Sequence, residues 1–564
     1  MVDLNSRRLG SLLIFLCGVM AVVVINQMSS RWFFRVDLTE EKRYTISEPT
    51  RQLLRDLDDV VYVDVFLEGD FPPAFKRLQK AVRETLDEYK VYAGKNLEFR
   101  FVNPSTAASE KSRNEFYQSL AGKGIQPTNV FDQANGTQTQ NLLFPGALLR
   151  SATDETAVNF LKGNKSAGPQ EQINQAIEGL EYELSTAIRK LTRPRNRRIA
   201  LLKGHGELDT VQIAGLSSAL LEHYRVYHVD LRQKEDLKGY DAIVMASPRE
   251  PFSEPDKYKI DQFIMRGGRG LFLIESMELN LDSAGGAGTY AIPRELNLND
   301  LFFRWGFRIN QDLVIDLNAS PYPVVVGNIG DQPQVALMPW PFFPLINRYA
   351  AHPMVRNLDA IYARTVSTVD TVKAPELQRT ALMFTSEYSR ILSAPVRVSV
   401  NDLRNEMMPE FFRAGPQPIA WLAEGHFLSL YRNRPLPEGA ERAGFIAEGG
   451  ESRIILCSDG DLARNDVNPK TGQPQELGFD PFTNMHYANP EFLLNALNYL
   501  LEEDGLIRAR GKEIRIRPLD PVKVKEQALR WKLINLLLPL ALIAVFGLAK
   551  NALRKRCYAR NRTS

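Results

Sequence analysis

The chain has 564 residues, of which 44% are hydrophobic and 24% charged, and its formal net charge is +3. This near-neutral balance provides no basic surface of the kind that binds nucleic acid, so we expect no nucleic acid among its partners. Three cysteines are present, and only Cys457 lies in the long stretch between residues 31 and 532. That stretch, termed the body, therefore has no second cysteine with which to form an internal disulfide.

Two uncharged apolar segments lie close to the ends of the sequence, at residues 9–30 and 533–549. A helix of about 20 apolar residues crosses a bilayer, so each segment is predicted to be a transmembrane helix, the second extended by Trp531 and Lys532 at the interface. A cleaved signal peptide is the alternative for the first segment, but no small-x-small cleavage site follows it. We therefore expect a body tethered to one membrane at both of its ends.

Positively charged residues predict the side of the membrane on which the body lies. Arg7 and Arg8 precede the first apolar segment, and an acid-free basic tail, Lys550–Arg562, follows the second. Such flanks face the cytoplasm, whereas the flanks on the body side mix basic with acidic residues. The pattern predicts a protein of the bacterial inner membrane with both termini in the cytoplasm and the body in the periplasm.

The first part of the body, residues 31–192, is predicted to form one α/β domain. Apolar, β-rich stretches at residues 60–67 and 97–102 flank a helix with apolar residues at helical spacing, which makes a βαβ unit with parallel strands. The element order β-α-β-(α)-β-β-α resembles a thioredoxin-like fold, but without a Cys-x-x-Cys motif no redox chemistry is implied. The later elements of this order are two short strands and a long helix, at residues 142–149, 157–161 and 171–191.

The second part, residues 193–345, is predicted to form a doubly wound parallel sheet, because apolar strands alternate with amphipathic helices. Class I glutamine amidotransferases share this sheet type but need a nucleophilic cysteine, which this part lacks. Residues 346–520 are predicted as a C-terminal α/β extension that packs on the same sheet. The aromatic, proline-rich segment Pro339–Pro344 is expected to be an irregular connection. The predicted strands of the sheet are at residues 199–203, 224–231, 240–248 and 270–276.

Sequence motifs of catalytic chemistry are absent. There is no G-x-x-x-x-G-K-[ST] phosphate-binding loop, no G-x-S-x-G nucleophile elbow and no H-E-x-x-H metal motif. The six histidines are scattered rather than clustered with cysteines at the spacing of a zinc site. We therefore predict that the protein is not an enzyme, with no catalytic residue, no metal and no cofactor.

Weak candidates for ligand binding lie in loops at the carboxyl ends of the predicted parallel strands, which form the binding crevice of doubly wound sheets. For the loop that contains His205, the favoured alternative is a cap on the helix that follows. For Asp459 and Asp461, it is a turn in which the aspartate side chains bond their own backbone. Trp421, Phe427 and Tyr431 could stack on a sugar, although such aromatic residues more often form core. The candidates are His205, Glu207, Asp209, Glu275, Asp459 and Asp461.

Four stretches of the sequence carry a family resemblance. They are FFRVDLTEEKRYTIS at residues 33–47, IALLKGHGE at 199–207, SRIILCSDGDLARND at 452–466 and NPEFLLNALNYLLEEDGLIRARGKEIRIRPLD at 489–520. With the terminal apolar segments they make the chain similar to the GldG family, the gliding-motility-associated auxiliary components of ABC transporters in Bacteroidetes. The resemblance implies a non-catalytic, membrane-tethered partner of an ATPase subunit and a permease subunit. It also implies a second domain like one in an intraflagellar transport protein.

Another class of function stays open beside this one. The strand-end crevice of the second domain would make the body a periplasmic carbohydrate- or peptide-binding module. An enzyme of the amidotransferase-like fold is a third class, but the chain lacks its nucleophile. The sequence thus predicts an accessory transporter subunit whose periplasmic body binds partner proteins or cargo.

Overall fold

The structure is a computed structural model. It describes residues 10, 15–24, 45–69, 71–106, 109–134, 137–161, 168–192, 196–280, 288–329, 332–399, 408–440, 444–501, 505–511 and 527–560. The chain divides into two compact units, Met1–Glu513 and Ile514–Ser564, and each is considered by itself. The predicted first span falls within the described residues only at positions 10 and 15–24, and the basic residues Arg7 and Arg8 fall outside them.

The first sheet of the larger unit has four strands in the order β2-β1-β5-β6. Strands β1 and β2 are parallel, which confirms the predicted βαβ pairing, whereas β5 and β6 are each antiparallel to the preceding strand of the sheet. A hairpin of β3 and β4, which the sequence analysis missed, pairs outside this sheet. The thioredoxin-like identification stays a prediction. The elements are α2 (Glu48–Arg55), β1 (Val61–Val65), α3 (Pro73–Ala93), β2 (Leu97–Phe101), α4 (Glu110–Gly122), β3 (Thr128–Ala134), β4 (Thr137–Leu143), β5 (Gly146–Arg150), β6 (Glu155–Asn159) and α5 (Pro169–Thr192).

Helix α3 shows why these residues fold as they do. Pro73 occupies its first turn, where a missing N–H costs nothing, and Gly94 with φ of 60° ends it. Its apolar residues recur every three or four positions and are fully buried against β1 and α5. These residues are Leu78, Val82, Leu86 and Tyr89.

The second sheet has eight strands in the order β17-β20-β23-β24-β10-β9-β7-β8. Strands β8, β7, β9, β10 and β24 are parallel, as the predicted doubly wound sheet requires. The other three strands come from the predicted extension beyond residue 345, for which no direction was predicted, and they alternate in direction. The described residues between β23 and β24, 429–440 and 444–447, form no crossover helix, and a connection without such a helix joins antiparallel strands. The strands are β7 (Arg198–Lys203), β8 (Arg225–Asp230), β9 (Ala242–Ala246), β10 (Arg269–Leu273), β17 (Arg348–Tyr349), β20 (Leu377–Phe384), β23 (Pro418–Leu428) and β24 (Glu448–Cys457).

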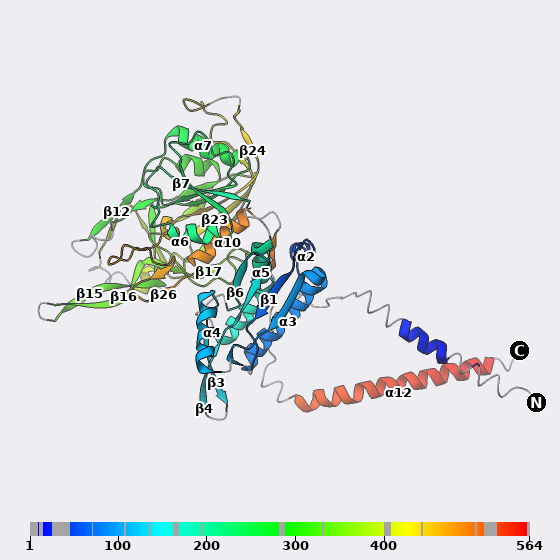
Figure 1. Ribbon diagram of the computed structural model, residues 1–564. Helices are drawn as coiled ribbons and strands as arrows, with labels where there is room; N and C mark the ends of the chain where they lie inside the picture. The colour runs from blue at the N-terminus through cyan, green and yellow to red at the C-terminus, as the bar shows by residue number, and fades with distance from the viewer. Residues whose placement is uncertain are drawn as a thin grey trace, which may run out of the picture. The chain divides into compact units, whose positions relative to one another are not determined.

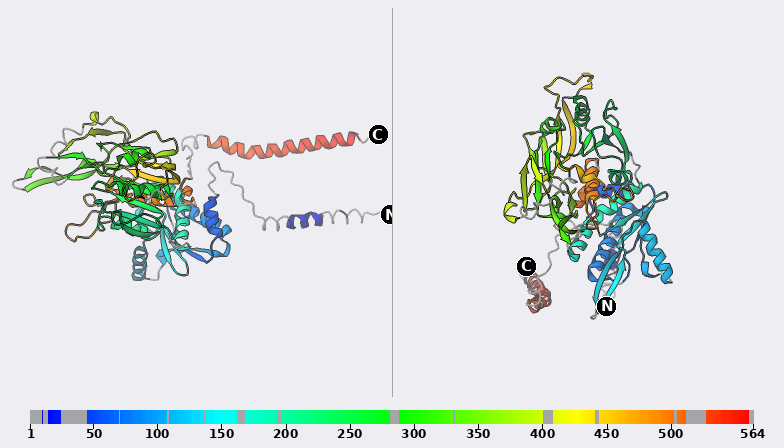
Figure 2. Two further views of the ribbon diagram at one scale, coloured as in Figure 1. Left: turned by 90° about the horizontal axis from the view of Figure 1, so that it is seen from above. Right: turned by 90° about the vertical axis from the view of Figure 1, so that its left-hand side faces the viewer.

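Helices cover both faces of the eight-stranded sheet (Figures 1 and 2). One apolar core joins alternate strand residues, such as Leu201 and Val244, to α6 (Ala214–Leu221) and α10 (Asn489–Leu501). The other joins the intervening residues, such as Leu202, to α7 (Glu254–Met265) and α8 (Asn299–Arg304). This two-sided burial explains the continuous apolar runs that identified the strands in the sequence. Strands from beyond residue 346 belong to the same sheet, while the domain boundaries at 192 and 345 stay predictions.

A set of smaller β-elements surrounds a separate aromatic core. The prediction of an irregular connection at Pro339–Pro344 is wrong, because this segment lies in β16, paired with β15 in a long hairpin (Figure 1). Its prolines lack a backbone donor, and the register shifts between Ala319 and Pro321 accommodate them. Buried Trp340 and Phe342 hold the segment in place. The elements are β11 (Met277–Glu278), β12 (Thr289–Pro293), β13 (Phe307–Ile309), β14 (Asp312–Asp316), β15 (Ala319–Ile329), β16 (Gln332–Ile346), β18 (Ile361–Tyr362), β19 (Val369–Thr371), β21 (Ser389–Ser393), β22 (Val396–Val398), β25 (Phe479–Asp480) and β26 (Met485–His486).

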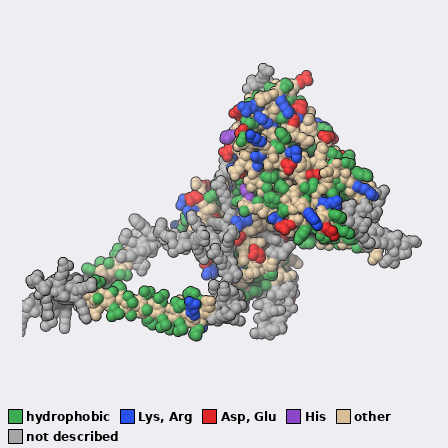
Figure 3. All heavy atoms as spheres, turned by 180° about the vertical axis from the view of Figure 1, so that it is seen from behind, with side chains coloured by type: hydrophobic (Ala, Val, Ile, Leu, Met, Phe, Trp, Pro, Cys, Tyr) green, Lys and Arg blue, Asp and Glu red, His purple; other side chains and the backbone are tan. Residues whose placement is uncertain are grey.

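The smaller unit contains one long helix, α12 (Ala528–Arg560). The 27-residue stretch Gln527–Leu553 contains an 18-residue window with a mean hydropathy of 2.1, and none of that window is buried. Apolar side chains cover the helix along its length (Figure 3). The helix is long and apolar enough to cross a membrane, and it contains the predicted span 533–549. The apolar helix at Phe15–Val24 has ten described residues, so the first span stays a prediction.

Candidate functional site

The predicted candidates lie just beyond the carboxyl ends of the parallel strands, and the structure brings five of the six into two neighbouring groups. His205 and Glu207 follow β7, Glu275 follows β10, and Asp459 with Asp461 follows β24. The backbone links the loops, because the carbonyl of His205 accepts hydrogen bonds from the N–H groups of Arg249 and Glu250 after β9. These five residues therefore lie at the carboxyl edge of the sheet, where the sequence analysis predicted them.

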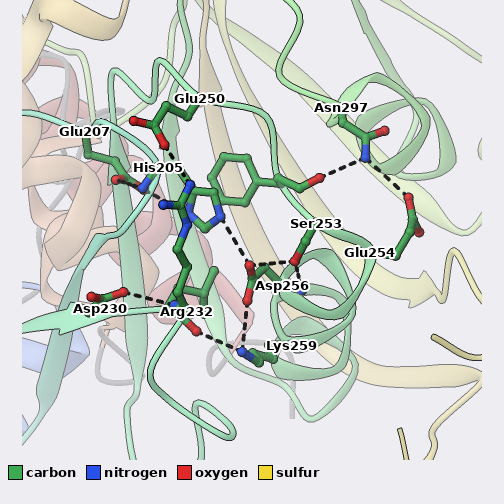
Figure 4. A network of polar contacts seen from close by, with 12 residues as sticks. His205, Glu207, Asp230, Arg232, Glu250, Ser253, Glu254, Asp256, Lys259 and Asn297 are labelled. Atoms are coloured by element: carbon green, nitrogen blue, oxygen red, sulfur yellow. Dashed lines mark hydrogen bonds and ion pairs between the residues drawn. The ribbon is translucent and has the colours of Figure 1, made fainter. Parts of the chain in front are cut away.

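The first group is built around the imidazole of His205, which is 1% exposed (Figure 4). Its Nε2 lies 3.3 Å from Asp256 Oδ2, and its ring stacks on Phe252 with a centroid distance of 3.8 Å. Glu207 Oε2 accepts the backbone N–H of His205 at 2.7 Å. Asp256 is held in turn by the hydroxyl of Ser253 and the ammonium of Lys259. The carboxylate of Glu207 thus stabilises its own loop; it bonds a residue before it in the chain rather than an N–H group of the helix that follows.

Two buried atoms of this group have no hydrogen-bond partner among the described residues: His205 Nδ1 and Glu207 Oε1, which are 3.8 Å apart. Burial lowers the pKa of His205, although the carboxylates of Glu207 and Asp256 oppose this effect. A neutral imidazole carries one N–H and can donate to only one of the two flanking carboxylates. The hydrogen bonds of this group therefore hold the loop after β7 to the start of α7.

The second group contains Glu275, which is buried between the ends of β9 and β10. Thr365 donates its hydroxyl to Glu275 Oε1, Ser247 Oγ lies 3.5 Å from Oε2, and Arg294 approaches Oε2 at 3.7 Å. Burial raises the pKa of Glu275 to about 7, with the Asp461 charge adding to the effect and the Thr365 bond opposing it. The carboxyl group is consequently close to half protonated at neutral pH.

Asp459 completes the second group and is 1% exposed. Its Oδ2 accepts the backbone N–H of Arg364 at 2.7 Å, and its Oδ1 accepts that of Asp461 at 2.8 Å. Burial, with the Asp461 charge, raises the pKa of Asp459 well above its usual value. The turn is tightly packed, because a Cβ on Gly460 would lie 2.8 Å from the Cβ of Ser247. The geometry matches the predicted alternative, in which aspartates bond their own backbone.

The remaining candidates lie apart from both groups. Asp209 Oδ1 accepts the N–H groups of Val211 and Gln212 and so caps the turn before α6. Phe427 and Tyr431 are buried in core, and the half-buried Trp421 packs against the same core. Whether any of the six candidates binds a ligand stays a prediction.

The closed packing limits what this edge can do chemically. A cavity lined by Arg294, Ile274 and Ser276 measures about 10 Å³, which is the space of roughly one water molecule. In the described parts of the chain no group of three or more His, Cys, Asp or Glu side chains is arranged to hold a metal ion. Sequence reasoning missed Asp256 and Thr365 as partners of these groups. Asp256 had a detectable signal, since Ser253-x-x-Asp256 is a capping box at the start of α7.

Comparison with known proteins assigns the chain at the family level. Residues 196–496, more than half of the chain, match the model of a family described as an ABC-type uncharacterized transport system. The chain belongs to this family. The matched range contains the whole eight-stranded sheet and all six candidates. Members of this family are auxiliary components of ABC-type transport, which indicates an accessory, transport-related role for the chain and plausible ABC transporter partners.

Other comparisons match further parts of the chain, but they give it no function more specific than that of this transport-system family. Residues 40–150 match a model of a domain of unknown function. An uncharacterized protein of Borreliella burgdorferi is 20% identical over 535 residues, which is 92% of this chain and 93% of that protein. The mmIFT52 N-terminal domain is 14% identical and aligns 98% of its length with 54% of this chain, but its TM-score of 0.30 is too low to carry an argument about fold.

Proposed function

We propose that the protein is a non-catalytic, membrane-anchored accessory subunit of an ABC-type transporter complex, in which it binds an ATPase subunit and a permease subunit. The family match over residues 196–496 carries this proposal. The apolar helix α12 supports it, because a span with no buried residue in its most apolar window needs a lipid or protein partner. The association with gliding motility rests on the resemblance to the GldG family and is part of the proposal.

We further propose that the body lies in the periplasm, that both termini lie in the cytoplasm and that the membrane is the bacterial inner membrane. The acid-free basic tail Lys550–Arg562, which follows the apolar span 533–549, supports this orientation. In this arrangement the body reaches partner proteins or cargo on the periplasmic side. The alternative of a carbohydrate- or peptide-binding module at the strand-end crevice has less support, because the groups at that edge are buried and bonded within the chain.

Co-purification tests the subunit proposal. The full chain, affinity-tagged and solubilised in mild detergent from its native membranes, should recover an ATPase and a multi-span permease identified by mass spectrometry. The matched control is the same chain with residues 527–553 replaced by a polyleucine span, which keeps the anchor but removes the native side chains of α12. Recovery of the chain alone, with a bound sugar, would favour the binding module instead.

Thiol labelling tests the orientation. Native Cys557 reports on the tail, and a Tyr388→Cys substitution reports on the body, since the Tyr388 side chain is 59% exposed. Both measurements use a Cys17→Ser background. In cells with a permeabilised outer barrier, a membrane-impermeant maleimide should label the cysteine introduced into the body, and it should label Cys557 only after detergent lysis. The reverse pattern would refute the periplasmic placement of the body.

A further inference from the structure

A pocket lies beside α8, one of the helices that cover a face of the eight-stranded sheet. The segment that follows β23, residues 429–434, runs along α7, where Leu430 bonds Asp261 and Tyr431 bonds Glu254. This segment and the end of α8 enclose a cavity of about 250 Å³. Its lining includes Asp300, Phe303, Arg304, Ser429, Arg432 and Arg434.

The pocket is lined by three arginines, two of which form ion pairs with carboxylates. Arg434 pairs with Asp300 at 2.7 Å, but Asp300 also accepts the buried ammonium of Lys257 at 3.0 Å. Although burial opposes it, the hydrogen bonds from Arg434 and Lys257 lower the pKa of Asp300, so this carboxylate is ionised and already shared between two cations. Arg304 donates through Nε to the Ser429 carbonyl and makes no ion pair within the described part of the chain. Arg432 pairs with Glu448 at 2.7 Å, so among the described residues Arg304 is the lining guanidinium left without an ion pair.

The floor of the pocket is held rigidly. Asp261, buried on α7, accepts the hydroxyl of Ser429 at 2.7 Å and the backbone N–H of Leu430 at 2.9 Å. The Ser429 hydroxyl accepts the N–H of Tyr431, whose phenol bonds Glu254. These bonds fix the Ser429 carbonyl, which orients Arg304 before any ligand binds. A side chain that is already oriented loses less entropy when a ligand binds.

The chemistry of the lining defines the class of ligand. Guanidinium groups bind phosphate through paired, charge-assisted hydrogen bonds. Phe303 is 56% exposed beside them and provides a flat apolar face on which a sugar ring can stack. The volume lies just below the range that holds drug-sized ligands, so the occupant is small. We propose that this arginine pocket binds a small phosphorylated sugar, with Arg304 and Arg434 on the phosphate and Phe303 on the ring.

Calorimetric titration of the detergent-solubilised full chain tests the proposal with three probes: glucose 6-phosphate, inorganic phosphate and glucose. Glucose 6-phosphate should bind most tightly, phosphate more weakly, and glucose not measurably. Arg304→Gln with Arg434→Gln should weaken glucose 6-phosphate binding by at least about tenfold, because each substitution removes a charge-assisted hydrogen bond. Phe303→Ala should weaken the binding of the sugar phosphate and leave that of inorganic phosphate unchanged.

One control variant and one further pocket variant show whether a change in affinity comes from the pocket itself. Arg308→Gln removes an arginine that is 61% exposed and pairs with Asp370 outside the pocket, and it should change no affinity. Arg432→Gln alters a side chain that is 40% exposed at the pocket, so it should reduce affinity while the fold is retained, as a thermal melt will verify. The proposal is overturned if neither phosphate probe saturates, if the double variant binds as tightly as the parent, or if inorganic phosphate binds as well as the sugar phosphate.

Discussion

The carboxyl edge of the eight-stranded sheet and the pocket beside α8 differ in how their polar groups are satisfied. At the carboxyl edge, Glu275, Asp459 and His205 are buried, and their partners come from the chain itself. At the pocket, Arg432 and Arg434 are two-fifths to one-half exposed around an open cavity, and each pairs with one carboxylate, Glu448 or Asp300. The described candidates at the edge that the fold class predicts as a binding crevice are buried, whereas the arginines of the pocket, which the fold class does not predict, are partly exposed.

This difference shows why strand-end position alone does not identify a site. Loops at the carboxyl ends converge whether or not a ligand is present, and here their polar side chains pair with one another. A buried carboxyl group held by hydroxyl and backbone donors stabilises the turn around it, and its raised pKa follows from burial rather than from catalysis. Substitutions in the two regions should therefore affect different properties: stability at the carboxyl edge and ligand affinity at the arginine pocket.

The largest effect is expected from Glu275→Gln and depends on pH. Because the pKa of Glu275 is raised from 4.5 to about 7 in the folded protein, its stabilising contribution is complete below about pH 4.5 and is lost as the pH rises through 7. The variant keeps the hydrogen-bonding shape without the charge. Its free energy of unfolding, relative to the parent, should increase between pH 5 and 8 by on the order of 3 kcal/mol.

Denaturant titrations at a series of pH values measure this difference. The control is Glu278→Gln, which changes an exposed carboxylate in β11 and should change the free energy of unfolding by no more than about 0.5 kcal/mol. A flat difference for Glu275→Gln would mean that this carboxyl group is solvated and that the carboxyl edge is more open than described.

A smaller effect is expected from a single added methyl group in the turn after β24. Gly460→Ala places its Cβ 2.8 Å from the Cβ of Ser247, and overpacking of this kind costs about 1–3 kcal/mol. Gly450→Ala, within β24, meets no atom within 4 Å and should change stability by no more than about 0.5 kcal/mol. Thermal unfolding of both variants gives the comparison, and equal melting temperatures would contradict the close packing of this turn.

The smallest effect on stability is expected at the arginine pocket. Arg432→Gln with Arg434→Gln removes two exposed ion pairs, to Glu448 and Asp300, and such pairs contribute about 0–1 kcal/mol each. The melting temperature of this variant should stay close to that of the parent, while its phosphate affinity falls. A loss of stability comparable to that of Gly460→Ala would mean that the arginines serve the fold rather than a ligand.

Periodicity in the sequence predicted the elements of the parallel region well, because fully buried strands and amphipathic helices each leave a local pattern. Helix α10 was expected from Asn489 through Leu501 and is observed over those residues. The hairpin of β15 and β16 was missed, because pairing along the hairpin and burial of Trp340 override the local preference of proline against strands. The directions of β17, β20 and β23 were missed for a similar reason, since pairing over long sequence distances leaves no local pattern.

The candidate residues show the same division. The sequence placed Glu275 and Asp459 at strand ends, and the parallel sheet brings them to one edge. It did not predict their burial, which depends on Thr365 and Arg364 from a distant loop. Nor did it indicate the arginine pocket, because Arg304 and Arg434 lie far apart in the chain and no motif joins them.

The most direct test of the accessory-subunit proposal is ATP hydrolysis, measured before and after the chain is separated from its partners. The complex co-purified with the tagged chain should release phosphate from ATP, and the chain stripped of its partners should release none. His205→Ala in the tagged chain should leave the turnover number per ATPase subunit unchanged. Phosphate release by the stripped chain, abolished by His205→Ala or Glu207→Ala, would contradict the account.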